Sequence, residues 1–343
     1  MRTPRNVFSC RLRPSAVPAL ALLALAPLAA KANDSAAVIG SGGIVLATTE
    51  DVSMDREDLY ISPSAVRVDY VFTNRTNKTV ETVIAFPMPD IEFRSEEYAA
   101  VPDPQSDNFM DFKVEQDGAP IDVELQQRAS AAGLDVTSEL KAARVPLQAL
   151  NDKTQIAIDA LPAETKSDWA ARGILREENG GGEGAVGYVA GWKLQSTYWW
   201  RTVFPAGQSV KVHHSYKPSV GGTVDTAFLM DGKKSDSFPD YARRYCVNDN
   251  FVKVVLKAKA DLGKDDYLME KWLSYILMTG NNWQGPIGTF HLTVDKEDPS
   301  SLVSFCGDGV KKTGPTTFEM TAKDYYPQRD LDVLVVYRQN VAQ

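Results

Sequence analysis

The stretch Tyr188–Phe204, "YVAGWKLQSTYWWRTVF", decides the fold class because apolar and polar side chains alternate along it. Lys193, Gln195 and Arg201 occupy odd-numbered positions, whereas most even-numbered positions are large and apolar. A period of two residues is typical of a β-strand with one buried face, since successive side chains point to opposite sides of the strand. We therefore expect one buried aromatic face along this strand, formed by Trp192, Tyr198, Trp200 and Phe204.

The same alternation appears on both sides of this stretch. It resumes in residues 210–216 after a Pro-Ala-Gly turn, which predicts a long hairpin. Upstream, residues 65–73 and 80–86 alternate within a β-rich region that runs from Ile44 to Arg128. The predicted fold class is mainly β, with two antiparallel β-sandwich-like regions and a small helical insertion between them. Further strands are expected at residues 272–278, 288–294, 302–306, 317–322 and 331–338.

Residues 129–187 interrupt the β pattern. Helix-forming residues with helical apolar spacing predict short helices there, and the Gly-rich residues 179–187 are interpreted as a linker or hairpin tip. Another helix is expected over residues 251–260. The predicted organisation is a signal peptide at 1–32, an N-terminal β domain at 33–128, a helical insertion with its Gly-rich linker at 129–187, and a C-terminal β domain with a disulfide at 188–343.

The N-terminus has the three parts of a secretory signal peptide. Residues 1–13 contain four arginines and no acid, residues 16–30 are rich in Ala and Leu, and Ala30-Lys31-Ala32 has the small-x-small pattern of a cleavage site. The apolar run is too short for an ordinary membrane span. We therefore expect cleavage after Ala32, a periplasmic location, and no lipid anchor or integral membrane segment in the mature chain.

The charge of the chain excludes one broad class of partner. The formal net charge is −8, and removing residues 1–32 takes away five cations and no acid, which leaves −13. An acidic protein lacks the positive surface that attracts nucleic acid or an anionic membrane. We therefore expect an envelope protein or a small-molecule ligand as the partner, and no nucleic acid.

Two cysteines remain after the predicted cleavage, Cys246 and Cys306. An even number of cysteines in an exported chain favours a disulfide. The alternative is a pair of buried free thiols, and the spacing excludes a Cys-x-x-Cys redox site. We expect Cys246 and Cys306 to be bonded to each other.

Trp199 is the first candidate ligand-binding residue, because it breaks the polar face of its strand and lies close to Arg201. An exposed Trp beside an Arg is typical of binding hot spots and of sugar-stacking surfaces. The alternative is that the helical insertion covers this face and makes Trp199 part of the core. If a ligand site exists, we expect it where this face meets residues 129–175, since clefts between packed units are usual binding places.

The stretch Gly280–Gly288, "GNNWQGPIG", gives the second candidate. Its three glycines and Pro286 are typical of a demanding turn, so Trp283 is interpreted mainly as a buried anchor. The alternative is that Trp283 and Asn282 form the lip of a ligand site.

No catalytic residue, metal ligand or cofactor is assigned. His213 and His214 are adjacent on a strand and point to opposite faces, so they cannot readily bind one ion. We interpret all three histidines as structural, with His214 meeting His291 across the sheet. The acidic clusters, including residues 55–58, are interpreted as solvated charge, although paired carboxylates could also bind Ca²⁺ or hydrolyse a glycoside.

Seven stretches carry a family resemblance: "NDSAA" (33–37), "EDLYIS" (57–62), "AFPMPDIEF" (85–93), "WWRTVFPAG" (199–207), "HHSYKPSVGG" (213–222), "NWQGPIGTFHLTVDK" (282–296) and "LVSFCGDGV" (302–310). With them the chain resembles the bacterial exported family catalogued as domain of unknown function 4424 (DUF4424), which implies an exported β-rich protein of unassigned function. Residues 70–89 also resemble, more weakly, the strand–turn–strand of the vault/inter-α-trypsin-inhibitor (VIT) domain, with Met88 where leucine is usual. That similarity implies a sandwich and transfers no site.

These observations predict an exported, periplasmic, non-catalytic binding or structural protein of the cell envelope. The alternative is a periplasmic protein that binds a small hydrophobic or sugar-like molecule at the aromatic face of the C-terminal domain. A hydrolase is the third possibility, which no recognisable catalytic motif supports.

Overall fold

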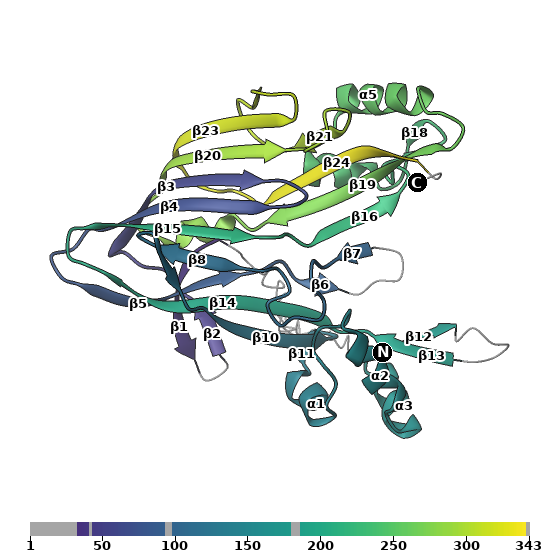
Figure 1. The fold of residues 1–343 in the computed structure, drawn as a ribbon, viewed down its shortest axis with the longest axis horizontal. Helices are drawn as coiled ribbons and strands as arrows, with labels where there is room; N and C mark the ends of the chain where they lie inside the picture. Colours follow the sequence, from purple (N-terminus) through teal and green to yellow (C-terminus); the bar gives the residue numbers. More distant parts are fainter. Residues whose placement is uncertain (1–32, 41–42, 93–97, 180–185, 341–343) are drawn as a thin grey trace, which may run out of the picture.

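The computed structural model describes residues 33–40, 43–92, 98–179 and 186–340. The described chain is mainly β, as the alternation predicts, and most of its strands form three sheets (Figure 1). Two further pairs of strands, β12 (Leu175–Asn179) with β13 (Val186–Ala190) and β17 (Leu229–Met230) with β18 (Lys233–Lys234), are separate ribbons.

The first sheet has the strand order β11-β10-β14-β5-β1-β2, and β6 pairs with one end of β14. All of its printed pairings are antiparallel. Its strands are β1 (Ser35–Gly40), β2 (Gly43–Leu46), β5 (Val80–Pro87), β6 (Ile91–Glu92), β10 (Glu124–Ala131), β11 (Leu134–Asp135) and β14 (Lys193–Phe204).

The second sheet has the order β22-β23-β20-β3-β4-β15-β8-β9. Only the pairing of β20 with β3 is parallel among the pairings described for this sheet. Its strands are β3 (Val52–Ile61), β4 (Val66–Asn74), β8 (Lys113–Gln116), β9 (Ala119–Ile121), β15 (Ser209–Tyr216), β20 (Ile287–Asp295), β22 (Lys311–Lys312) and β23 (Thr317–Tyr325).

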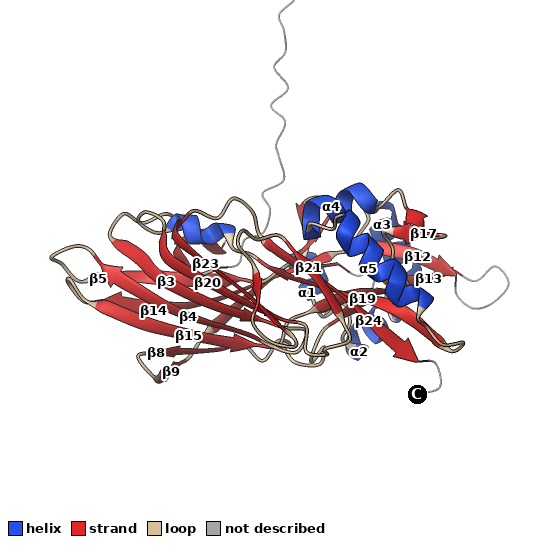
Figure 2. Cartoon of the chain, turned by 90° about the horizontal axis from the view of Figure 1, so that it is seen from above, coloured by secondary structure: helices blue, strands red, loops and turns tan. Residues whose placement is uncertain are grey.

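The third sheet has the order β21-β24-β19-β16-β7 and is antiparallel throughout its described pairings. Helices α4 and α5 cover one of its faces, where their apolar residues pack with Leu268, Leu334 and Val336 (Figure 2). Its strands are β7 (Tyr98–Ala100), β16 (Val220–Val224), β19 (Asp266–Tyr275), β21 (Leu302–Phe305) and β24 (Leu331–Asn340). The helices are α4 (Phe238–Tyr245) and α5 (Asp249–Ala260).

The largest core lies between the inner faces of these sheets. The aromatic face predicted for residues 188–204 is confirmed, because Trp192, Tyr198, Trp200 and Phe204 are each at most 2% exposed. In Figure 1 the first sheet lies below the second. Between them, the ring centres of Trp200 on β14 and His214 on β15 lie 5.3 Å apart. One-residue slippage of β14 would expose this whole face, so burial strongly specifies its register.

Strands from the two predicted β domains pair within the same sheets. Along the first sheet β14 pairs with β5, and along the second β15 pairs with β4 and β20 pairs with β3. The predicted boundary at residue 188 is therefore not a boundary between sheets. Alternation within a strand specifies which side chains are buried, but it does not specify which distant strand is the neighbour.

The helical insertion predicted within residues 129–187 is confirmed by three short helices, α1 (Thr137–Ala142), α2 (Asp152–Asp159) and α3 (Ala163–Ala171). The helix predicted over residues 251–260 corresponds to α5, whereas α4 was not predicted. The strand predicted over 272–278 ends at Tyr275 and is followed by the 3₁₀ helix η1 (Met278–Asn282). Among the residues that the structure describes, no helix is long and apolar enough to cross a membrane.

The predicted disulfide is confirmed, with an S–S distance of 2.08 Å between Cys246 and Cys306. Cys246 directly follows α4 in a left-handed conformation, and Cys306 directly follows β21. The bond therefore ties the C-terminal end of α4 to the edge of the third sheet, next to Arg244 and Tyr245.

Candidate functional site

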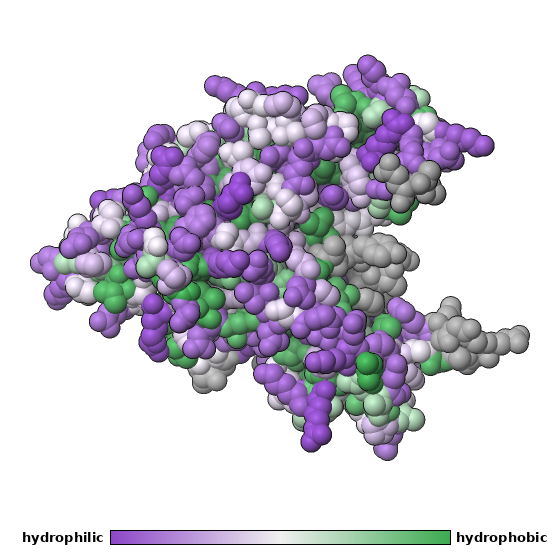
Figure 3. All heavy atoms as spheres, in the orientation of Figure 1, coloured by the Kyte–Doolittle hydropathy of each residue, from purple (hydrophilic) through white to green (hydrophobic). Residues whose placement is uncertain are grey.

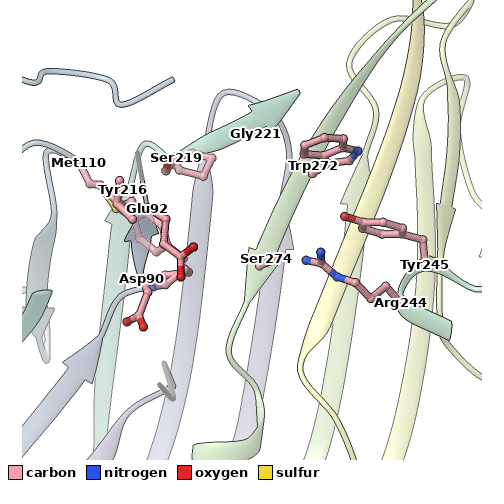
Figure 4. Close-up of a pocket in the computed structure, with 13 residues that line it drawn as sticks. Asp90, Glu92, Met110, Tyr216, Ser219, Gly221, Arg244, Tyr245, Trp272 and Ser274 are labelled. Atoms are coloured by element: carbon pink, nitrogen blue, oxygen red, sulfur yellow. The ribbon is translucent and has the colours of Figure 1, made fainter. Parts of the chain in front are cut away.

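A cleft with a volume of about 390 Å³ lies where elements of the three sheets meet (Figure 4). The first sheet contributes β6 and the two residues before it, the second contributes the end of β15, and the third contributes β16 and β19 together with the last turn of α4. We call this cavity the junction cleft. It is lined by Pro89, Asp90, Ile91, Glu92, Met110, Tyr216, Pro218, Ser219, Gly221, Arg244, Tyr245, Trp272 and Ser274.

One side of the junction cleft is acidic. Asp90 and Glu92 lie 3.4 and 2.8 Å from the Nζ atom of Lys193 on β14. Gln195 donates from Nε2 to Asp90 at 3.4 Å. Burial raises the pKa of Asp90, although Lys193 acts in the opposite direction. This side of the cleft therefore presents two carboxyl groups, with Lys193 beside them.

The opposite side carries Arg244 and Tyr245, at the end of α4 (Figure 4). The Arg244 Nη2 atom lies 3.0 Å from Asp332 Oδ1, and the same oxygen accepts a 2.6 Å hydrogen bond from Ser274. The Arg244 guanidinium also lies 5.1 Å from the centre of the Tyr245 ring. Asp332 therefore holds Arg244 while the guanidinium keeps further N–H donors that a ligand can use.

Trp272 on β19 forms an aromatic wall beside Arg244. Its Nε1 atom donates to Glu270 Oε2 at 2.8 Å, which fixes the orientation of the indole. A Cβ atom on Gly221 would lie 2.9 Å from Trp272 Cε3, so any larger residue at position 221 would displace the indole ring. The absence of a side chain at Gly221 therefore permits this ring position.

Trp283 and Asn282 lie beside the first described residues of the chain. Trp283 is 3% exposed, its ring centre lies 4.4 Å from that of Phe72 in a tilted arrangement, and its Nε1 donates to the backbone oxygen of Asp34 at 2.6 Å. Asn282 donates from Nδ2 to Ser35 Oγ at 2.8 Å. These contacts favour the interpretation of Trp283 as a buried anchor over that of a ligand lip.

Trp199 and Arg201 lie on the outer face of the first sheet. The alternative that the helical insertion covers this face does not hold for Trp199, whose side chain packs with Ala37, Val83 and Ala85. The reason is that β5 pairs with β14, and β1 pairs with the other edge of β5. Arg201 is exposed and lines a separate groove of about 510 Å³, together with Ala37, Val38, Ile39, Glu81, Thr82, Val83, Thr202 and Val203.

A group of buried polar side chains lies inside the main core, and we call it the N-terminal cluster. It consists of Asn33, Asp34, Glu57, Tyr70 and Tyr275, each at most 1% exposed. For Glu57 the interpretation of residues 55–58 as solvated charge is wrong. Burial raises the pKa of Glu57 to about 8 and, together with the nearby Glu57 charge, raises that of Asp34 well above its usual range.

His214 lies beside this cluster and not beside His291. Rings of Tyr70, Phe86 and Trp200 surround it at centroid distances of 5.0–5.3 Å. Its Nε2 atom lies 3.5 Å from Asp34 Oδ2, yet burial lowers the pKa of His214 to about 3, so the imidazole is neutral at pH 7. The expected meeting with His291 is wrong, because β3 and β4 separate their strands.

The other two histidines pair with surface acids. His213 Nδ1 lies 2.8 Å from Asp69, and His291 Nδ1 lies 3.4 Å from Asp58. Within the described ranges, no group of three or more His, Cys, Asp or Glu side chains has the arrangement of a metal site.

The sequence contained one usable signal for Glu57. A register shift between Met54 and Arg56 moves the buried face of β3 from even to odd positions. Leu59 and Ile61 are buried and share their parity with Glu57, which therefore lies on the core face. For Asp90, Arg244 and Trp272 no local pattern brings the three together, because they come from segments that are distant in sequence.

The three packed sheets and the junction cleft define a β-rich protein with a polar cavity between its sheets. Residues 32–334 match the family described as Domain of unknown function (DUF4424), and the chain belongs to this family. No curated protein matches the sequence.

Two solved structures have a low similarity to the chain. A candidate nutrient-binding protein from Legionella pneumophila subsp. pneumophila str. Philadelphia 1 has 14% identity and a TM-score of 0.42, and the match covers 90% of this chain and 72% of that one. An M1 zinc metallopeptidase from Deinococcus radiodurans has 9% identity and a TM-score of 0.25, with coverage of 84% and 43%. Likenesses at these scores do not bear on function.

Proposed function

We propose that the protein is an exported, periplasmic, non-catalytic binding protein whose junction cleft holds a small polar molecule. The ligand carries an amine at one end and a carboxylate or hydroxyl groups at the other. The observation that carries this proposal is the placement of Asp90 and Glu92 opposite Arg244 across a cavity of about 390 Å³ (Figure 4).

The charges at the two sides support a ligand of this kind. The acidic side presents the carboxyl groups of Asp90 and Glu92, which favours an amine. The opposite side presents Arg244, whose guanidinium has five N–H donors in a planar fork that suits a carboxylate. A ligand that contacts both sides at once forms charge-assisted hydrogen bonds at each end, and these bonds fix its orientation in the cleft.

The size and lining of the cleft favour a small polar molecule over the hydrophobic one considered from the sequence. A volume of about 390 Å³ lies near the lower end of the usual range for ligand pockets, about 300–1,000 Å³. Ser219 and Ser274 add hydroxyl groups, and Trp272 adds one flat surface for stacking. The cleft therefore suits a compact, amino-acid-like or amino-sugar-like molecule.

Export is supported by the signal-peptide pattern of residues 1–32 and by the disulfide between Cys246 and Cys306, since disulfides persist mainly in oxidising compartments. The non-catalytic role is supported by the positions of the histidines. His214 is enclosed in the core and neutral, while His213 and His291 pair with acids on strands of the second sheet.

A ligand panel tests the proposal. Zwitterionic amino acids, amino sugars, neutral sugars and monocarboxylates would be titrated into the mature protein by calorimetry, with melting temperature as a second measurement. We expect binding by a compound that carries an amine and no binding by monocarboxylates. Binding by neutral sugars alone, or turnover of any compound, would contradict the proposal. Intact-mass analysis of the exported chain tests the location, with a mass that begins at Asn33 expected.

A further inference from the structure

The first described residues of the chain lie in the interior. Asn33, Asp34 and Ser35 are each 0% exposed, although chain termini usually lie at the surface. The predicted cleavage after Ala32 would make Asn33 the first residue of the mature protein. The α-nitrogen of the mature chain would then belong to a residue that is wholly enclosed by the fold.

Every polar group of Asn33 for which a contact is described is bound inside the N-terminal cluster. Its Nδ2 atom donates to Glu57 Oε2 at 3.0 Å, and its Oδ1 atom accepts from the Tyr70 hydroxyl at 2.6 Å and from the backbone N–H of Asp34 at 2.8 Å. Its carbonyl accepts from Thr279 Oγ1 at 2.9 Å. These bonds fix the position of the Asn33 Cα atom, and thus of the nitrogen one bond away.

The N-terminal cluster contains two carboxyl groups and lacks a compensating cation among the described residues. Neither oxygen of the Asp34 carboxyl accepts a hydrogen bond, although both are buried. The nearest candidate, His214, is neutral at pH 7. The hydrogen bonds described for Glu57 come from the neutral groups of Asn33 and Tyr275. A buried carboxylate without a cation is costly, so this arrangement favours binding of a positive group.

We propose that signal-peptide cleavage supplies this positive group: the α-ammonium of Asn33 binds between the carboxylates of Asp34 and Glu57 and completes the fold of the mature protein. Water hydrolyses the Ala32–Asn33 peptide bond, which leaves a carboxylate on Ala32 and an amine on Asn33 that is protonated at neutral pH. This inference rests on the cleavage position in the proposed function and is independent of the ligand in the junction cleft.

The consequence is a link between processing and stability. Before cleavage the nitrogen of Asn33 is an uncharged amide, so the two carboxyl groups remain uncompensated and the folded precursor is less stable. After cleavage one ammonium compensates them. The titratable groups of the cluster around it are the carboxyls of Asp34 and Glu57, the hydroxyls of Tyr70 and Tyr275, and the neutral imidazole of His214.

The experiment compares two chains that differ by one residue. One begins at Asn33 and the other retains Ala32, and both are released from a removable fusion so that no other residue remains. We expect the equilibrium constant for unfolding to be on the order of a hundredfold larger for the chain that retains Ala32 than for the chain that begins at Asn33. This is the effect expected when a buried charge pair loses one partner. Equal constants for the two chains would overturn the inference.

A double-mutant cycle separates the charge interaction from the bulk of the extra residue. In the Asp34→Asn/Glu57→Gln background we expect the ratio between the two chains to fall to about one, because the variant keeps the size of both side chains and removes their charge. Asp58→Asn is the matched control, since Asp58 follows Glu57 on β3 and points to the opposite, solvated face, where it pairs with Arg56. An unchanged ratio in the double variant would overturn the inference.

A direct titration of the α-amine needs no variant. In the chain that begins at Asn33, labelled with ¹⁵N at asparagine, we expect the α-amine pKa to lie above its usual value of about 7.7–8.0 and to return to it on unfolding. An ordinary value in the folded protein would overturn the inference. A natural N-terminus other than Asn33 would contradict the cleavage position instead, so the two failures are distinguishable.

Discussion

The N-terminal cluster and the junction cleft each contain a pair of acidic side chains, yet their surroundings give these acids different roles. Asp34 and Glu57 are enclosed by the core, and burial raises the pKa of Glu57 to about 8. Asp90 and Glu92 lie at an open cavity and have Lys193 as a partner. Changes in the cluster should therefore alter folding, whereas changes in the cleft should alter binding at nearly constant stability.

The largest expected effect is a pH dependence in the chain that retains Ala32. The folded state raises the pKa of Glu57 from 4.5 to about 8, so it holds this proton more tightly than the unfolded state does. The resulting stabilisation is complete below about pH 4.5 and is lost as the pH rises to about 8, with a total on the order of 5 kcal/mol. Urea unfolding at a series of pH values measures it.

Glu57→Gln should remove the part of the pH dependence that comes from Glu57, since the amide does not titrate, and should leave the part that comes from Asp34. In the chain that begins at Asn33 the loss should be smaller, because the ammonium stabilises the Glu57 carboxylate. A stability that stays constant between pH 4.5 and 8 in the longer chain would show that the Glu57 carboxyl is not desolvated as the structure indicates.

The next largest effect is on stability and comes from Trp283, the buried anchor beside the N-terminal cluster. Trp283→Ala should lower the free energy of unfolding by about 3–5 kcal/mol, because it removes a buried indole that contacts Phe72 and Asp34. Trp199→Ala is the matched control and should cost less, since Trp199 is only half-buried on the outer face. If Trp283→Ala unfolds like the wild type but loses ligand, Trp283 is part of a binding site and the anchor interpretation fails.

The sequence predicted those features that depend on local pattern. The alternation in residues 188–204 specified the buried face of β14, and the count of exported cysteines specified the bond between Cys246 and Cys306. The first prediction needs only a two-residue alternation of apolar and polar side chains, and the second needs only two cysteines in an exported chain. The signal for Glu57, which shares the odd-numbered face of β3 with Leu59 and Ile61, was also local. Using it requires recognising the register shift before Arg56.

The candidate site could not be predicted in the same way. Asp90, Arg244 and Trp272 meet because the first and third sheets converge there, and sheet pairing joins segments that are far apart in the chain. For the same reason the sequence left open whether the helical insertion covers Trp199, and it did not predict the packing of Trp199 with residues of β5 and β1. Long-range strand order decided both outcomes.

The disulfide links stability to the cleft. The Cys246→Ser/Cys306→Ser variant should lose about 2–4 kcal/mol, since it removes a crosslink between residues 60 positions apart. Because Arg244 and Tyr245 directly precede Cys246, ligand affinity should fall as well when it is measured under conditions where the variant is folded. Unchanged affinity in the folded variant would show that the α4 turn keeps its position without the bond.

The smallest expected effect on stability is in the junction cleft itself. Arg244→Gln should change the free energy of unfolding by less than about 1 kcal/mol, because the pair with Asp332 is partly exposed and Ser274 still donates to that carboxylate. The same change should weaken binding of the tightest compound of the panel by about ten- to a hundredfold, as expected for loss of a charge-assisted hydrogen bond.

Arg243→Gln is the matched control, since Arg243 is the preceding residue of α4, is largely exposed and pairs with Asp240. Calorimetric titration and urea unfolding of both variants separate the two effects. Equal loss of affinity in both variants would assign the effect to the overall charge of α4 and would remove Arg244 from the site.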